Sequence, residues 1–212
     1  YKQRVIELKQ NDKNVYNVGA LSIDNLKELP LYSIKEFKNK FNIDLSKPSI
    51  LITFNPETVS FKKNEKYVDE LIAALCETKN YQLIITMPNA DTKANIIRKK
   101  LNDYIQENKN AIAVESFGAS AYLSCMKHCT FMLGNTSSGF VEAAYFPKYV
   151  INLGDRQRGR IVTENIRNCK IDKDAIIEAV YDFPDIKLPA KINIYGNGNT
   201  AGKILNILKT SS

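Results

Sequence analysis

The sequence lacks a long apolar run, a signal peptide and a dense set of cysteines, and each absence excludes a class of protein. No apolar stretch approaches the roughly 18 residues that a transmembrane helix needs, so we expect no membrane partner. The four cysteines are scattered through apolar or helical surroundings, which indicates reduced thiols in a cytoplasmic protein. The chain starts with Tyr1 instead of methionine, so we expect a fragment of a longer protein.

Metal ligands are also scarce. The segment CMKHC contains Cys125, Cys129 and the single histidine, His128, but no second ligand cluster completes a zinc site. The two cysteines lie one helical turn apart in an apolar stripe, which favours buried thiols. The stretch GNGNTAGKI is similar to a phosphate loop, yet its spacing is wrong and Ile204 replaces the required Ser or Thr. We expect no metal and no cofactor.

The net charge of +7 is spread along the chain instead of being concentrated in one block. Such a diffuse charge suits any phosphorylated partner, and it is equally explained by solubility. No stripe of alternating aromatic and basic residues is suited to base stacking, so a nucleic-acid partner is not expected.

Short apolar runs alternate with amphipathic segments over most of the chain. The runs are typical of strands buried on both faces, and the segments between them carry apolar residues at helical spacing. Strands are predicted at residues 49–54, 81–87, 111–115, 131–134 and 149–154, and helices at 64–78, 91–108, 118–129 and 173–181. This alternation predicts an α/β fold, a Rossmann-like parallel sheet with helices on both faces, which binds its ligand at the carboxyl ends of the strands.

The ends of the chain do not follow the alternation. Residues 1–30 are predicted as a linker and the end of a preceding domain, with a helix at 2–9 and then a strand-and-turn pattern. Residues 31–195 form the predicted nucleotide-binding domain, and residues 196–212 a C-terminal helix that begins near Thr200.

The segment GNTSSGFVEA places hydroxyl groups directly after a predicted strand. Thr136, Ser137 and Ser138, next to Gly139, could bind phosphate oxygens together with free backbone N–H groups at the start of the following helix. Ser and Thr are also favoured as simple helix caps, but a cap accounts for one hydroxyl and not for three. Glu142, in the first turn of that helix, either pairs with the helix dipole or accepts hydrogen bonds from ribose hydroxyls.

Three more candidates follow other predicted strands. Arg156, in the loop GDRQRGR, has a planar guanidinium suited to a phosphate contact. Asn55 and Asn89 lie after the first and second strands, where Asn is also routine turn chemistry.

Together these loops resemble the C-terminal half of the hydrolysing UDP-N-acetylglucosamine 2-epimerases, including the bacterial enzymes of sialic and legionaminic acid biosynthesis. The stretches that carry the resemblance run in family order over nearly the whole chain: VYNVGALSIDN, ITFNPET, MPNADT, YLSCMKHCTFMLGNTSSGFVEA, VINLGDRQRGR and YGNGNT.

The resemblance implies one domain of a glycosyltransferase-B-type enzyme that holds UDP between two Rossmann-like domains. It implies the conversion of UDP-GlcNAc, or of a related UDP-2-acetamido sugar, to free ManNAc or its analogue plus UDP. The route is elimination of UDP followed by hydration of the resulting glycal. Positions matching the family's site are Thr136, Ser137 and Arg156 at the diphosphate, Glu142 at the ribose, and Asn89 and Phe117 at the nucleotide, with Phe117 near the uracil.

Two departures from the family pattern affect these expectations. Asn55 stands where the family usually has a histidine, and a neutral amide cannot transfer a proton at neutral pH. The first half of the family chain, with its catalytic acidic residues, is missing, so we expect no catalytic residue in this chain. Association into a homo-oligomer is a further expectation from the family. Two alternatives stay open, a glycosyltransferase of the same fold and a non-catalytic UDP-sugar-binding protein.

Overall fold

The computed structural model describes residues 2–57, 61–89, 94–183, 186–190 and 192–210. The chain forms two compact units, one of residues 29–192 and one that combines residues 1–28 with 193–212. Among the described residues, no helix is long and apolar enough to cross a membrane.

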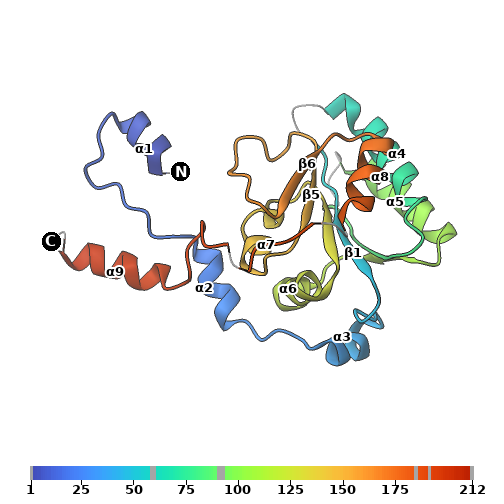
Figure 1. Ribbon diagram of the computed structural model, residues 1–212, viewed down its shortest axis with the longest axis horizontal. Helices are drawn as coiled ribbons and strands as arrows, with labels where there is room; N and C mark the ends of the chain where they lie inside the picture. Colours follow the sequence, from blue (N-terminus) through green and yellow to red (C-terminus); the bar gives the residue numbers. More distant parts are fainter. Residues whose placement is uncertain (1, 58–60, 90–93, 184–185, 191, 211–212) are drawn as a thin grey trace. The chain divides into compact units, whose positions relative to one another are not determined.

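The larger unit is built on one six-stranded sheet, which is parallel as the sequence predicts (Figure 1). Its strands are β1 (Ser49–Thr53), β2 (Gln82–Thr86), β3 (Ala111–Val114), β4 (Phe131–Gly134), β5 (Val150–Leu153) and β6 (Ile166–Cys169). They lie in the order β3-β2-β1-β4-β5-β6. The chain therefore reverses its direction of winding between β1 and β4, and this switch point is where open α/β sheets bind ligands.

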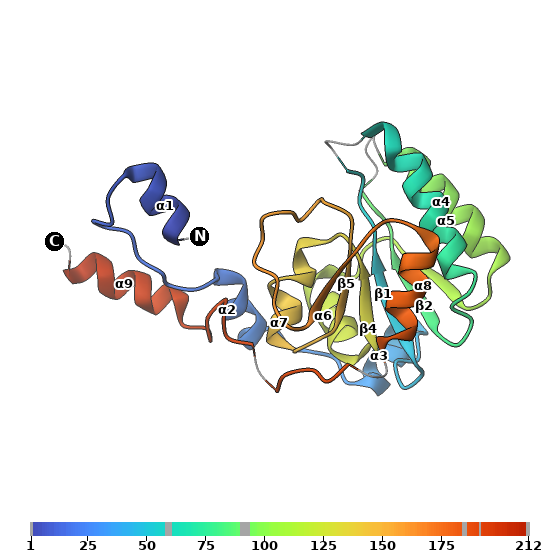
Figure 2. The same ribbon diagram turned by 45° about the horizontal axis from the view of Figure 1, so that its top comes forward.

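Helices cover both faces of the sheet, which explains the continuous apolar strands (Figure 2). On one face α4 (Asn64–Leu75) contacts α5 (Asn95–Glu107) and α8 (Lys173–Tyr181). On the other face lie α3 (Ile34–Phe41), α6 (Gly118–His128) and α7 (Glu142–Tyr145), with α6 in contact with both of the others. The helix predicted from residue 91 begins at Asn95, and residues 91–93 lie outside the described part.

The sequence-based elements differ from the structure in three places. The prediction of a strand and turn before residue 30 is wrong, because residues 21–28 form the helix α2 (Leu21–Glu28). Its buried residues Ile23 and Leu26 lie three positions apart, which is helical spacing. Helix α3 was not expected; a capping box, in which Ser33 and Glu36 bond each other's backbone, starts it. Strand β6 was also not expected, since Arg167 and Asn168 interrupt its apolar pattern.

The smaller unit joins the two ends of the chain. Helix α1 (Lys2–Lys9) has the predicted bounds, helix α9 (Thr200–Thr210) begins where it is predicted to begin, and α9 contacts α2. The Asp24 carboxylate of α2 accepts hydrogen bonds from the backbone N–H groups of Thr200 (3.0 Å) and Ala201 (3.1 Å). An acidic side chain distant in sequence therefore caps the first turn of α9.

Candidate functional site at the carboxyl edge of the sheet

Asn135, directly after β4, joins the loops that follow three strands. Its side chain accepts a hydrogen bond from the Asn55 N–H and donates one to the Asn55 carbonyl, both 2.8 Å long. Its own carbonyl oxygen accepts bonds from Arg156 Nη1 (3.0 Å) and Gln157 Nε2 (2.9 Å). The side chain is fully buried, so Asn135 fixes the β1 and β5 loops beside the loop that begins at Thr136.

The approach of β4 to β1 depends on a glycine. Gly134 has φ of +144°, and a Cβ at this position would lie 2.0 Å from the Thr53 carbonyl oxygen. No other residue fits a backbone this close to its neighbour. Gly139 serves packing too, because its Cβ would lie 3.0 Å from Val150 Cγ1.

The hydroxyl loop Thr136–Gly139 turns away from β4 as a 3-10 turn over Ser137–Gly139. Three backbone N–H groups in and after this loop, which the sequence predicts to be free, are bonded within the turn. The N–H of Ser138 donates to Thr136 Oγ1 (3.4 Å), that of Gly139 to the Thr136 carbonyl (3.3 Å) and that of Phe140 to the Ser137 carbonyl (3.0 Å). A tight turn satisfies these donors internally, so the side-chain hydroxyls are important additional groups for a ligand.

Those hydroxyls are linked to a tyrosine of α6. The Tyr122 hydroxyl lies 2.6 Å from Ser138 Oγ, which lies 3.1 Å from Thr136 Oγ1. Burial raises the pKa of Tyr122 above its ordinary value, although the hydrogen bond with Ser138 and the nearby Thr53 and Thr136 hydroxyls oppose the rise. Tyr122 is therefore protonated at neutral pH and can act as a donor.

The structure brings some of the predicted site residues together and leaves others apart. Asn55, Thr136 and Arg156 meet around Asn135, and Ser138 is linked to Thr136. Glu142 begins α7, in the first turn as expected.

Asn89 and Phe117 lie on other loops, those that follow β2 and β3. Asn89 is exposed. The partly buried Phe117 ring packs against Phe37 and Phe41, at centroid distances of 5.4 and 5.3 Å. Ser137 is exposed on the hydroxyl loop.

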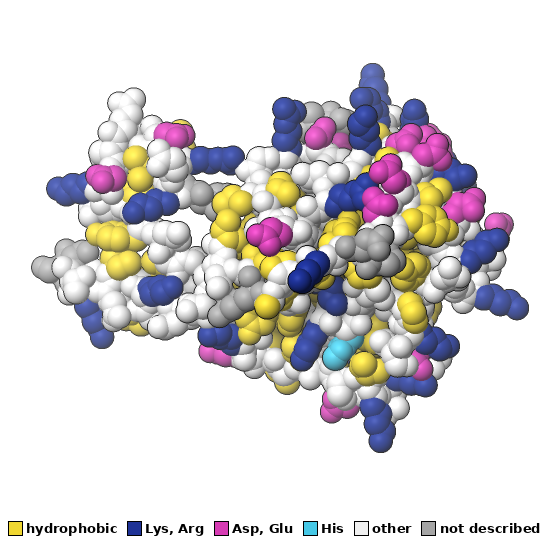
Figure 3. Space-filling model, in the orientation of Figure 1, with side chains coloured by type: hydrophobic (Ala, Val, Ile, Leu, Met, Phe, Trp, Pro, Cys, Tyr) yellow, Lys and Arg dark blue, Asp and Glu magenta, His cyan; other side chains and the backbone are white. Residues whose placement is uncertain are grey.

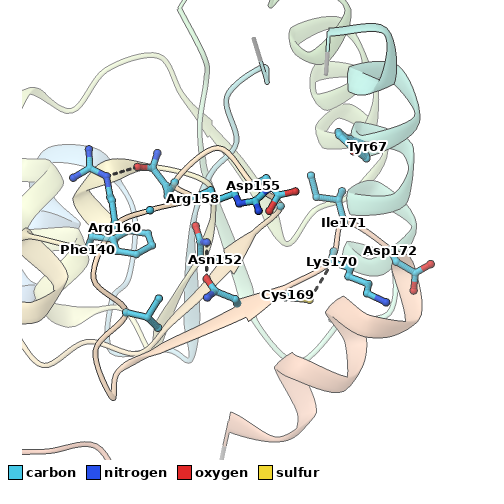
Figure 4. A pocket seen from close by; sticks show the side chains of 15 residues that line it. Tyr67, Phe140, Asn152, Asp155, Arg158, Arg160, Cys169, Lys170, Ile171 and Asp172 are labelled. Atoms are coloured by element: carbon cyan, nitrogen blue, oxygen red, sulfur yellow. Dashed lines mark hydrogen bonds between the residues drawn. The ribbon is translucent and has the colours of Figure 1, made fainter. Parts of the chain in front are cut away.

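Sequence reasoning missed Asn135, Gln157 and Tyr122. The signal for the first was its position, a polar residue directly after an apolar strand and before the hydroxyl run. Gln157 is buried, and its Oε1 accepts a 2.6 Å bond from Arg160 Nε (Figure 4). Neither Gln157 nor Tyr122 carries a comparable signal, since each acts through a partner from another element.

A cavity of about 520 Å³ lies beside this group, between the β5 loop and β6 (Figure 4). Residues of that loop, of β6 and of α4 line it, and none of the nine predicted site residues does. The hydrogen-bonded pair Asn152 and Asn168 forms part of its wall (2.8 Å). The predicted site therefore rests on the hydrogen bonds at the switch point and not on this cavity.

Metal ligation finds no support in the described ranges, where no three His, Cys, Asp or Glu side chains gather. Cys125 and Cys129 are buried on or beside α6, and burial raises the pKa of both thiols. His128 Nε2 lies 3.1 Å from the Tyr32 carbonyl oxygen.

Comparison with known proteins agrees with the fold and the motifs. Residues 1–209 match the family model of UDP-N-acetylglucosamine 2-epimerase. The chain is 36% identical over 173 residues to a GDP/UDP-N,N'-diacetylbacillosamine 2-epimerase (hydrolyzing) of Campylobacter jejuni, covering 81% of this chain and 45% of that protein. It is 28% identical over 212 residues to the UDP-N,N'-diacetylbacillosamine 2-epimerase (hydrolyzing) of Legionella pneumophila, covering 99% and 55%.

Solved structures show the same fold. The UDP-GlcNAc 2-epimerase from Neisseria meningitidis, bound to UDP-GlcNAc, superposes with a TM-score of 0.79 at 19% identity, covering 99% of this chain and 59% of that one. The chain thus spans about half the length of the curated relatives that it matches. From the match over residues 1–209, the motifs and the sheet order together, we conclude that this chain belongs to the UDP-N-acetylglucosamine 2-epimerase family.

Proposed function

We propose that this chain is the nucleotide-binding part of a hydrolysing UDP-GlcNAc 2-epimerase, which converts UDP-GlcNAc or a related UDP-2-acetamido sugar to ManNAc or its analogue and UDP. The observation that carries the proposal is the arrangement around Asn135. There the Arg156 guanidinium bonds the carbonyl oxygen of Asn135, the residue directly before the hydroxyl loop, at the switch point of the sheet. Relatives named as hydrolysing 2-epimerases support the reaction.

In this proposal the site binds the leaving group. Thr136 and Ser137 donate to the diphosphate, Ser138 lies in the same loop behind them, and Arg156 neutralises part of its charge. Donors fixed before the reaction stabilise a departing anion at little reorganisation cost. Glu142 accepts bonds from the ribose hydroxyls, while Asn89 and Phe117 lie at the nucleotide base.

The remaining parts of the proposal concern the whole protein. The acidic groups that act on the sugar come from a domain that precedes these residues, and the protein works in the cytoplasm. The described cysteines, all free thiols, are consistent with a reducing compartment. A role in sialic acid or polysaccharide biosynthesis is supported by the 31% identity, over 93% of this chain, to the polysialic acid biosynthesis protein P7 of Escherichia coli.

The test of the half-site is a titration of this chain with UDP and, separately, with UMP, followed through the backbone amides by NMR. We expect shifts at Asn89, Phe117, residues 136–142 and Arg156, with tighter binding of UDP because only UDP carries the second phosphate. Equal affinities would contradict the diphosphate roles. Release of ManNAc and UDP by the full-length protein tests the reaction itself, and UDP-GlcNAc bound without turnover would favour a binding protein.

A further inference from the structure

Tyr122 is hydrogen-bonded to the hydroxyl loop. The role that we infer for it rests on the proposed function. The residue lies in the second turn of α6, and its hydroxyl contacts the loop at Ser138 Oγ (2.6 Å). Ser138 passes the contact on to Thr136 Oγ1 (3.1 Å). The three oxygens form one chain that runs from a helix of the fold to a residue proposed to bind phosphate.

The direction of the protons in this chain matters because three N–H groups of the turn are already occupied. The N–H groups of Ser138, Gly139 and Phe140 bond within the turn. Hydroxyl protons that point outward are therefore needed to add donors for an anion at Ser138 and Gly139. A hydroxyl has one proton and two acceptor lone pairs, so each hydroxyl's neighbour decides where its proton goes.

Proton counting gives the direction. A phenol is more acidic than an aliphatic hydroxyl, so Tyr122 is the better donor of the pair and Ser138 accepts. The single Ser138 proton is then directed to Thr136 Oγ1, which also accepts the Ser138 N–H (3.4 Å). With both of its lone pairs occupied, Thr136 has only its own proton left to offer, and that proton faces away from the turn.

We infer that Tyr122 is a positioning residue: it orients the Ser138 and Thr136 hydroxyls so that Thr136 donates to a phosphoryl oxygen of a nucleoside diphosphate. Tyr122 itself does not touch the ligand. Reversal of the chain would present lone pairs to the anion and repel it, so the orientation selects for a negatively charged group.

The first experiment measures the dissociation constants of UDP and of uridine for the wild-type chain and for Tyr122→Phe. We expect UDP to bind about fivefold to tenfold more weakly, the effect of losing one oriented hydrogen bond. Uridine lacks a phosphate and should bind with unchanged affinity. Tyr104→Phe is the matched control, because the Tyr104 hydroxyl is buried on α5 without a hydrogen-bond partner in the described structure.

A double-mutant cycle tests the chain itself. Ser138→Ala removes the middle hydroxyl, so adding Tyr122→Phe to it should cause little further loss of UDP affinity. Additive losses would overturn the inference. So would an unchanged UDP affinity in Tyr122→Phe, or an equal loss for UDP and uridine, which would indicate a general distortion of the turn. If the wild-type chain binds no UDP at millimolar concentration, the proposed function of this chain fails, and the inference fails with it.

Discussion

At the residue scale, the site depends on one uncharged amide that was not predicted as a site residue. Asn135 bonds the Asn55 backbone through both ends of its side-chain amide and supports Arg156 and Gln157 through its carbonyl. Its complete burial makes the arrangement sensitive, since a buried donor or acceptor without a partner is costly.

Asn135→Leu keeps the approximate size and removes both side-chain bonds to Asn55. We expect the free energy of unfolding to fall by about 2 to 4 kcal/mol, because an N–H and a carbonyl lose their partners. Urea denaturation measures the change. Asn89→Ala, at an exposed position after β2, should stay within about 0.5 kcal/mol of the wild type. Similar losses for the two variants would contradict the structural role of Asn135.

The same scale shows what the sequence could and could not reveal about the site. Thr136 and Arg156 were predicted because each belongs to a run of functional residue types after an apolar strand. Tyr122 was not, because its partner Ser138 lies 16 positions away and only the packing of α6 against the sheet brings them together. A side chain that acts by orienting a residue of another element leaves no recognisable pattern in the sequence around it.

At the element scale, the strands with an apolar sequence were predictable and the polar or capped elements were not. Strands β1 to β5 are mostly apolar, and all but the edge strand β3 are largely buried. Strand β6, at the other edge, carries Arg167 and Asn168 among its four residues, so no apolar run marks it. Helix α2 was missed because a partner distant in sequence, α9, stabilises it, and only the fold brings that contact about.

The contact between α2 and α9 gives a prediction at this scale. Asp24→Ala removes the acceptor for the first N–H groups of α9, so the first turn should open more often. Amide hydrogen exchange at residues 200–203 should become several-fold faster. Glu28→Ala, an exposed position on α2, serves as the control. Unchanged exchange in Asp24→Ala would show that the carboxylate does not hold the helix end.

At the scale of the whole molecule, the positive charge is spread over the chain, and three carboxylates accept hydrogen bonds from neighbouring groups. Figure 3 shows Lys and Arg side chains scattered over the visible face among acidic ones, in agreement with the diffuse charge of the sequence. Hydrogen bonds lower the pKa of three carboxyls: Glu36 through Ser33, Asp44 through Lys38, and Asp24 through the Thr200 backbone.

These lowered pKa values fix the sign of a pH dependence. A carboxyl whose pKa is lower in the folded state stabilises that state above its unfolded pKa of about 4, and this contribution is lost as the pH falls. The urea midpoint should therefore decrease between about pH 5 and pH 2. Asp44→Asn removes one of the three groups and should make the decrease smaller. An equal decrease in variant and wild type would show that Asp44 does not contribute.

The hydrogen bonds from Thr200 and Ala201 to Asp24 also have a consequence for the order in which the protein forms during synthesis. Residues 29–192 leave the ribosome before residues 193–212, so the sheet unit has all its strands while α2 still lacks α9. Domains fold as units as they are synthesised. Of the two units, the smaller is therefore completed later, and a nascent chain arrested before residue 193 would carry a finished sheet while α2 still lacks its partner helix.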